Sequence, residues 1–244
     1  NTTDGAIAVA VADVDRNGYN DILSAGFDDD KIQWFENSFV QSANLTFSIS
    51  NISTAADQPY SVFAVDMDSD GDVDVLSASK NDDKIAWYEN NGSESFTART
   101  ITTSADGANS VYAIDVDNDG DIDIFACNIL LVNDGSANFA FHETLGRSLQ
   151  FSYGNPMSSL MVDLNNDDYD DLVFWNFDNR SEDFTEEGFV LLSNGTADLN
   201  NWTLLELPEG PFGRNHNKFN HAVWGDICLL YTSAAADEGL GVDL

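Results

Sequence analysis

An acidic loop of nine residues recurs four times along the chain, and its residue types and spacing suit a metal ion. The copies span residues 13–21 (loop 1), 66–74 (loop 2), 115–123 (loop 3) and 163–171 (loop 4). Positions 1, 3, 5 and 9 are Asp or Asn, and position 7 offers a backbone carbonyl. The candidate ligands are Asp13, Asp15, Asn17, Tyr19 and Asp21; Asp66, Asp68, Asp70, Asp72 and Asp74; Asp115, Asp117, Asp119, Asp121 and Asp123; and Asp163, Asn165, Asp167, Tyr169 and Asp171.

The chemistry of this donor set indicates Ca²⁺, which takes six to eight oxygen ligands in flexible geometry. Position 6 must turn sharply, and it is Gly18, Gly71 or Gly120 in three loops and Asp168 in the fourth. One such loop could equally be a metal-free Asp- and Gly-rich turn. Four copies in register favour Ca²⁺, because the clustered carboxylates would otherwise repel one another. Loops 1 and 4 have Asn at one ligand position, so we expect them to bind more weakly.

These loops differ from the helix-flanked calcium loop that ends in Glu at position 12. Position 12 is Ser24, Ser77, Ala126 or Phe174. Short apolar runs rich in β-branched and aromatic residues lie on both sides of each loop, which predicts strands. The sequence therefore predicts a calcium loop between two strands rather than between two helices.

The whole-chain composition excludes several classes of function. The 244 residues carry 43 acidic and 9 basic side chains, for a net charge of −34. Such a charge argues against nucleic-acid binding and against anionic membrane surfaces. No run of about 20 apolar residues is present, so no membrane insertion is predicted. Two cysteines exclude a disulfide framework, and we expect Cys127 to be a small buried side chain.

The spacing of the loops predicts the architecture that must position them. Loop starts lie 53, 49 and 48 residues apart, which is typical of repeat proteins. Each repeat contains four short strands, and a four-stranded sheet can bury both of its faces by radial stacking. We therefore expect an all-β fold, a β-propeller of four-stranded antiparallel blades, with Trp34 and Trp87 between blades. The expected blades span about 6–53, 58–104, 107–150 and 156–210, with a partial fifth from 219.

The run Asp66–Asp74 with Val75–Ser79, and the strand that contains Ile85, Trp87, Tyr88, Glu89 and Asn90, resemble VCBS and FG-GAP repeats. Integrin α-subunit propellers carry related repeats. The resemblance covers about residues 4–226. It implies a propeller, usually seven-bladed, with calcium in the loop that joins the innermost strand to the second. It also implies secretion or display on the cell surface.

The pattern breaks near the end of the chain. Residues 222–226 resemble the start of a fifth calcium loop, but residues 227–244 do not continue it. We expect this tail to be foreign to the propeller, and the chain to be a mature form or a fragment, an open arc of a larger ring. Possible glycosylation sequons begin at Asn1, Asn44, Asn51, Asn91, Asn179, Asn194 and Asn201.

Three functions fit these features. The preferred one is a non-catalytic, calcium-binding extracellular module that recognises a glycan or protein ligand. The turns 28–31 and 81–84, together with Asp4, Asp57 and Asp106, would form its recognition face. The alternatives are a secreted calcium-dependent enzyme such as a polysaccharide lyase, and a purely structural repeat. No catalytic motif is evident; a short cluster of Arg214, His216, Lys218 and His221 is a weak candidate site.

Overall fold

The computed structural model describes residues 4–38, 46–93, 95–127, 129–144, 158–177, 186–196, 198 and 201–206. Every regular element in these ranges is a β-strand. Sheet 1 contains β1 (Ala6–Ala12), β2 (Asp21–Gly26), β3 (Lys31–Asn37) and β4 (Phe47–Ser53). Sheet 2 contains β5 (Pro59–Val65), β6 (Asp74–Ser79), β7 (Lys84–Asn90) and β8 (Phe96–Thr102). Sheet 3 contains β9 (Val111–Ile114), β10 (Asp123–Ala126), β11 (Ile129–Asn133) and β12 (Phe139–Thr144). Sheet 4 contains β13 (Ser158–Val162), β14 (Asp171–Phe177), β15 (Glu186–Leu192) and β16 (Thr203–Glu206).

Each sheet is an antiparallel meander in which neighbours in the sequence are neighbours in the sheet. Loop lengths favour this order, because short turns can join antiparallel strands only. The second strands are the most buried: all six residues of β6 are buried. A strand covered on both faces needs a continuous run of apolar and small residues, as in Val75–Ser79. The fourth strands are largely exposed, with five exposed residues in succession in β4.

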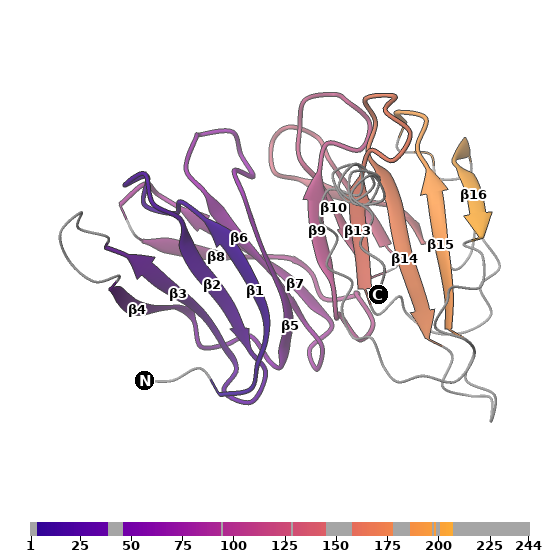
Figure 1. Cartoon of the computed structure of the whole chain (residues 1–244). Coiled ribbons are helices and arrows are strands. Elements are labelled where there is room, and N and C mark those ends of the chain that lie inside the picture. The colour runs from indigo at the N-terminus through magenta and orange to yellow at the C-terminus, as the bar shows by residue number, and fades with distance from the viewer. Residues whose placement is uncertain are drawn as a thin grey trace, which may run out of the picture.

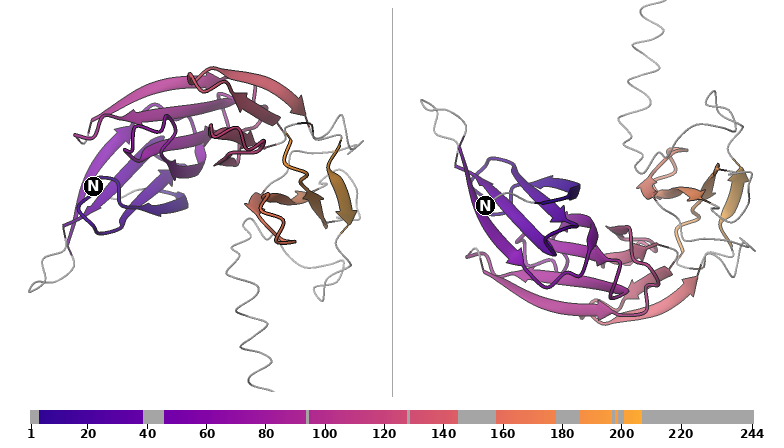
Figure 2. Two further views of the ribbon diagram at one scale, coloured as in Figure 1. Left: turned by 90° about the horizontal axis from the view of Figure 1, so that it is seen from above. Right: turned by 90° about the horizontal axis from the view of Figure 1, so that it is seen from below.

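The four sheets follow one another along an arc (Figures 1 and 2). Their first strands contact one another in order, β1 with β5, β5 with β9, and β9 with β13. These strands therefore occupy the inner side of the arc, as the innermost strands of propeller blades do. The prediction of an all-β fold of four-stranded antiparallel blades is confirmed, and the described sheets do not close into a ring (Figure 2).

Apolar side chains fill the space between successive sheets. Sheets 1 and 2 enclose a cluster that includes Leu23, Ile32 and Trp34, and sheets 2 and 3 enclose one that includes Ile85 and Trp87. The clusters between sheets 1 and 2 and between sheets 2 and 3 thus contain the two tryptophans that the sequence places between blades. The cluster between sheets 3 and 4 includes Phe125, Leu172 and Trp202. Cys127 is a buried free thiol in the cluster between sheets 2 and 3, which confirms its prediction as a core residue.

Several expectations fall outside the described residues. The partial fifth blade from 219, the tail 227–244 and the cluster of residues 214–221 all lie there. The blade boundaries and a seven-bladed ring stay predictions. In the described part of the chain, no helix is long and apolar enough to cross a membrane.

Candidate metal centres

All four acidic loops occupy the same place in their sheets, between the first and the second strand. Loop 1 follows Ala12 of β1, and its last residue, Asp21, is the first residue of β2. Likewise, Asp74, Asp123 and Asp171 begin β6, β10 and β14. The candidate ligand at position 9 is therefore part of a sheet, while positions 1–7 lie in the connection.

Two left-handed residues curl each loop. Position 6 has positive φ in every copy: 88° at Gly18, 91° at Gly71, 95° at Gly120 and 71° at Asp168. The sequence predicted this at the glycines. Position 4 is also left-handed, with φ of 58–59° at Arg16, Ser69, Asn118 and Asn166. Sequence reasoning missed position 4, because these four residues share no side-chain type that marks such a conformation.

Hydrogen bonds from backbone N–H groups to side-chain oxygens of the same loop stabilise its curled conformation. The position 1 carboxylate accepts the position 6 N–H in all four loops: at 2.9 Å in loops 1 and 2, 3.0 Å in loop 3 and 3.1 Å in loop 4. The side-chain oxygen at position 5 accepts the position 7 N–H at 2.8–3.0 Å. In loops 1 and 2, Oδ1 of Asp13 and Oδ1 of Asp66 accept none of these bonds and stay available for another partner.

The carboxylate at position 9 has a different role, because it is fully buried. Asp74 accepts the N–H of Met67 in the loop at 3.0 Å and the N–H of Asn90 at the end of β7 at 2.7 Å. Asp21, Asp123 and Asp171 are equally buried and make the same pair of bonds to loop position 2 and to the end of the third strand. Position 9 therefore fastens the loop to the sheet.

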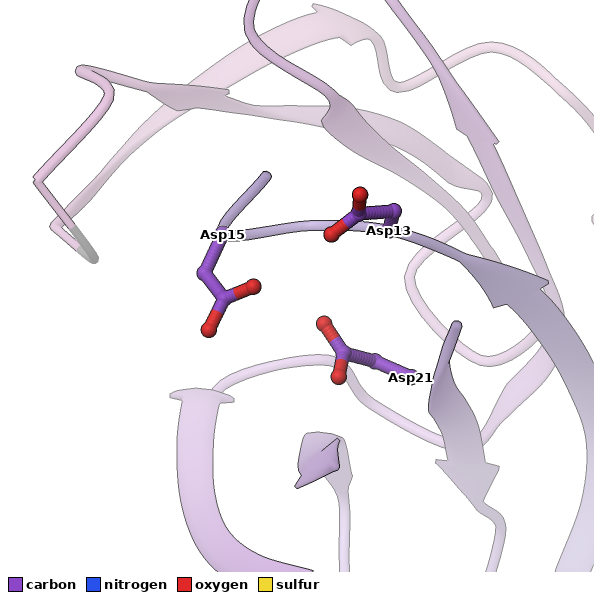
Figure 3. Close-up of side chains that lie close together, drawn as sticks. All are labelled: Asp13, Asp15 and Asp21. Atoms are coloured by element: carbon purple, nitrogen blue, oxygen red, sulfur yellow. The ribbon is translucent and has the colours of Figure 1, made fainter. Parts of the chain in front are cut away.

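Three of the loops bring acidic side chains together as a cation would require. The groups are Asp13, Asp15 and Asp21 in loop 1; Asp66, Asp68 and Asp70 in loop 2; and Asp115, Asp117 and Asp123 in loop 3. Within each group, one oxygen from each residue lies within 4.8 Å of the others. Figure 3 shows the three carboxylates of loop 1 facing a common space.

Buried oxygens without a hydrogen-bond partner mark the same three loops. In the loops these are Oδ1 of Asp13, Oδ1 of Asp66 and Oδ1 of Asp117; two turn acids outside the loops, Asp29 and Asp82, also have such an oxygen. An unsatisfied buried carboxylate oxygen is costly unless a donor or a cation meets it. The donor set and these oxygens therefore fit a hard cation, and the three groups named above would hold it.

Loop 4 departs from this arrangement. Its curl is the same, but Asn165 replaces the acid at position 3 and donates through Nδ2 to Asp167 Oδ2 at 2.9 Å. Among the described residues, loop 4 holds no comparable group of three acidic side chains. Asp163, Asn165, Asp167, Tyr169 and Asp171 therefore stay predicted ligands of the weakest candidate site.

Burial raises the pKa of three position 9 acids, Asp74, Asp123 and Asp171. The pKa of Asp74 and that of Asp123 rise from 3.8 to about 6, chiefly because burial disfavours the charged form, although backbone N–H donors oppose this. The pKa values of Asp15, Asp68 and Asp117 at position 3 are also raised, first by burial and then, at Asp68 and Asp117, by the neighbouring position 5 carboxylates. Without a cation, each cluster therefore resists full ionisation.

In loops 2–4, the position 7 side chain lies against the turn between the third and fourth strands. A Cβ at Gly92 would lie 2.5 Å from Asp72 Oδ2, and one at Gly135 would lie 2.5 Å from Asp121 Oδ2. Tyr169 lies in the same way against Gly195. This placement agrees with a position 7 contribution through the backbone carbonyl, which stays a prediction for Tyr19, Asp72, Asp121 and Tyr169.

Sequence reasoning missed one more part of the site, the Asn that ends the third strand. Asn37, Asn90 and Asn133 each donate their side-chain amide to the backbone carbonyl at loop position 8, at 3.0–3.1 Å. Each also donates its backbone N–H to the position 9 carboxylate. The repeated Asn was visible in the sequence, but it resembled a turn residue. Ser193 replaces it in sheet 4 and keeps the backbone bond.

The opposite end of the sheets carries a second group of side chains, as the sequence predicts. Asn81 donates to Asp57 Oδ1 at 3.1 Å, so the turn 81–84 and Asp57 do share one end. Beside them, Phe27 of sheet 1 and Tyr60 of sheet 2 pack edge to face, with ring centroids 5.1 Å apart. The Lys80 ammonium lies 4.7 Å from the Tyr60 ring centroid. We call Phe27, Asp57, Tyr60, Lys80 and Asn81 the inter-blade aromatic cluster.

Comparison with solved structures gives low overall similarity. The V. cholerae biofilm matrix protein Bap1 matches 78% of this chain and 27% of its own, with 22% identity and a TM-score of 0.47. A second structure, BBS1N in complex with ARL6DN, matches 87% of this chain and 57% of its own, with 11% identity and a TM-score of 0.46. The chain thus spans about a quarter of the first and just over half of the second. No curated protein matches the sequence.

The family comparison is more specific. The FG-GAP-like repeat matches twice, at residues 13–77 and at residues 66–126. Each match begins at position 1 of an acidic loop, and the second ends where β10 ends. Each match therefore runs from one acidic loop through the next and into the strand that follows it. The predicted resemblance to FG-GAP repeats is thus confirmed over residues 13–126, which contain loops 1–3.

Proposed function

We propose that loops 1–3 bind Ca²⁺ and that the bound ions stabilise an extracellular, non-catalytic propeller module. The observation that carries the proposal is the coincidence of convergent carboxylates and unpartnered buried oxygens in the same three loops. A hard divalent cation would meet these oxygens and offset the repulsion within each group. Partly exposed carboxylate sites of this kind suit calcium at the concentrations found outside cells.

The ion would act mainly on structure. Positions 1, 3 and 5 belong to the loop, and position 9 belongs to the second strand, so a cation shared by them would join the two. Because binding favours the folded state only, it would add to the free energy of unfolding. Calcium supplies charge neutralisation here, and the chain's own residues supply the curl, the anchoring at position 9 and the burial.

Isothermal titration calorimetry tests the metal assignment. We expect Ca²⁺ to bind to the full chain with several equivalents and Mg²⁺ to bind more weakly, because Mg²⁺ dehydrates reluctantly and demands octahedral geometry. Asp68→Asn should remove one equivalent. Asp57→Asn, an exposed acid at the opposite end of sheet 2, is the matched control and should remove none. Absence of calcium binding by the wild-type chain would overturn the proposal.

For recognition, we propose that the inter-blade aromatic cluster contacts a glycan or protein ligand. Its support is chemical: half-buried rings lie beside exposed amide, ammonium and carboxylate groups, and aromatic faces with polar neighbours suit both sugar rings and peptide surfaces. The cluster also spans two sheets, so calcium that stiffens the sheets would stiffen the surface.

A glycan array and a protein-interaction screen with the full chain in calcium test this second part. Tyr60→Ala should weaken binding at least about tenfold, a loss of about 1.4 kcal/mol. Phe47→Ala, at an exposed aromatic residue of β4, should leave binding unchanged. Unsaturated sugar products in the glycan experiment would show an enzyme instead. Binding that tolerates Tyr60→Ala would place the recognition surface elsewhere.

A further inference from the structure

A path of buried hydrogen bonds joins loop 1 to loop 2 across the boundary between sheets 1 and 2. Asn90 Nδ2 donates to the carbonyl oxygen of Val14, at position 2 of loop 1, at 3.2 Å. The N–H of Val14 donates to Asp21 Oδ2 at 3.1 Å, and the N–H of Asn90 donates to Asp74 Oδ1 at 2.7 Å. Val14, Asp21, Asp74 and Asn90 are each at most 2% exposed. The two position 9 acids are therefore connected through only two residues.

An ion pair makes a second connection at the surface. Arg16 Nη1, from position 4 of loop 1, lies 3.0 Å from Asp72 Oδ1, at position 7 of loop 2. The same guanidinium lies against Gly71, where a Cβ would come within 2.6 Å of Arg16 Nη2. Arg16 is held in the left-handed conformation that curls its own loop. A change in the backbone conformation of loop 1 would thus move the Arg16 guanidinium, which contacts loop 2.

Between loops 2 and 3, the described residues form no counterpart of the Asn90–Val14 hydrogen bond or of the Arg16–Asp72 ion pair. The counterpart of Arg16 in loop 2 is Ser69, which has no charge. The counterpart of Asn90 is Asn133, whose Nδ2 donates to Ile122 O within its own sheet. Within the described ranges, no hydrogen bond runs from Asn133 to loop 2. The connection between loops 1 and 2 is therefore a specific feature of this pair.

We propose that loops 1 and 2 bind calcium as a positively coupled pair, with Asn90 and Arg16 as positioning residues, while loop 3 binds independently. This inference rests on the proposed calcium function. A cation that orders loop 1 fixes Val14 and Arg16, so loop 2 loses less conformational entropy when it binds. Repulsion between two ions opposes the coupling, but salt screens it beyond about 8 Å at physiological ionic strength.

The position 6 glycines give each loop its own reporter. Their N–H groups donate to the position 1 carboxylates, so the NMR amide signals of Gly18, Gly71 and Gly120 should shift as each loop fills. The full chain, labelled with ¹⁵N, is titrated with CaCl₂. Asp15→Asn weakens loop 1, and Asp117→Asn makes the same change at the same position of loop 3 as the matched control.

We expect Asp15→Asn to raise the calcium midpoint of Gly71 by about fivefold or more, the lower end of common coupling strengths. Asp117→Asn should leave the Gly71 midpoint within twofold. In an Arg16→Asn background, which removes the charge and keeps a residue type found at this left-handed position in loops 3 and 4, the effect of Asp15→Asn on Gly71 should shrink, and Asn90→Ser should reduce it further if that buried variant folds. The comparison of Asp15→Asn with Asp117→Asn tests the coupling of loops 1 and 2 even if the Arg16 and Asn90 variants do not fold.

A Gly71 midpoint unchanged by Asp15→Asn, while the Gly18 response weakens, would overturn the coupling and leave calcium binding intact. An equal effect of Asp117→Asn would show a general effect of charge, and it would also overturn the specific pair. Absence of any calcium-dependent shift in the wild-type chain would instead overturn the proposed function itself. The three failures are therefore distinguishable.

Discussion

At the scale of single residues, the position 9 aspartate is more important than its place at the end of the loop suggests. Asp74 is fully buried and accepts two backbone N–H groups from separate segments, the loop and the end of β7. An amide in its place would turn an NH₂ group toward one of these donors. We therefore expect Asp74→Asn to lower the free energy of unfolding by about 1–3 kcal/mol, the usual cost of leaving a buried donor unsatisfied.

Urea denaturation in calcium-free buffer measures this effect without a contribution from metal. The matched control is Asp28→Asn, at an exposed acid in the turn between β2 and β3, which should change the free energy of unfolding by less than about 0.5 kcal/mol. Equal effects of the two substitutions would contradict a structural role for the buried carboxylate.

The same residues predict an unusual pH dependence. The folded, calcium-free protein holds the pKa of Asp74 and Asp123 at about 6, against an ordinary value of 3.8. The folded state therefore binds more protons than the unfolded state between these values, and stability falls as pH rises from about 4 through 6. Thermal melting in calcium-free buffer at pH 5 and pH 7 should show the higher midpoint at pH 5.

Calcium should reverse this trend, because carboxylates must lose their protons to bind a cation. Calcium affinity should accordingly rise between pH 5 and pH 7, as calorimetry at the two values would measure. A double Asp74→Asn and Asp123→Asn variant should lose much of the calcium-free pH dependence. A wild-type chain that melts at a higher temperature at pH 7 than at pH 5 without calcium would contradict the prediction.

At the scale of elements, the turn between the second and third strands fastens sheet 1 to the segment that leads into sheet 2, and sheet 2 to the segment that leads into sheet 3. Asp83 accepts the N–H of Gly107 on its side chain at 2.8 Å and the N–H of Ala105 on its backbone at 3.0 Å. Asp30 makes the corresponding bonds to Gln58 and Ala56. Sequence analysis identified these turns as polar and placed them on one face. It did not show that their last Asp joins neighbouring sheets.

We expect Asp83→Ala to lower the free energy of unfolding by about 1–2 kcal/mol, because it removes a hydrogen bond between sheets. The residue has φ of 52°, a conformation that Asn adopts more readily than Ala, so part of the loss in Asp83→Ala comes from the backbone. Asp83→Asn keeps the acceptor oxygen and is the matched control, with a smaller expected loss. Urea denaturation in calcium measures both, and equal losses would show that the side-chain oxygen is not the cause.

At the scale of the whole molecule, the large negative net charge is the property that most affects stability. The net charge is −34, and 18 of the 43 acids lie in the four loops. We expect removal of calcium with a chelator to lower the melting temperature clearly. A site at a free calcium concentration of about 100 times its Kd adds about 2.7 kcal/mol to stability. Sodium chloride should restore part of the loss because it screens repulsion.

Differential scanning fluorimetry with calcium, with chelator, and with chelator plus salt tests this prediction. Magnesium at the same concentration as calcium is the control and should protect less. Identical melting curves with and without calcium would contradict a stabilising role for the ion. A full recovery in salt alone would show that charge screening, rather than specific binding, explains the effect of calcium.

The sequence by itself determined much of this protein. The period of about 50 residues, the apolar runs around each loop and the glycines at position 6 indicated four-stranded sheets with left-handed turns. These features are local, because strand-forming residues and positive φ depend on the residue and its immediate neighbours. The acids at positions 1 and 3 lie together in loops 1–3 for the same reason: a tight curl brings near neighbours together whatever the rest of the chain does.

Only the tertiary structure decided the contacts between distant segments. Asn90 and Val14 are 76 residues apart, and the bond between them exists because sheet 2 stacks on sheet 1. The pairing of Arg16 with Asp72 and the bond from Gly107 to Asp83 have the same origin. No spacing rule predicts such contacts, since they depend on the angle and offset at which apolar faces pack. Packing likewise decided that the position 9 acids are buried, and burial is what raises the pKa values of Asp74, Asp123 and Asp171.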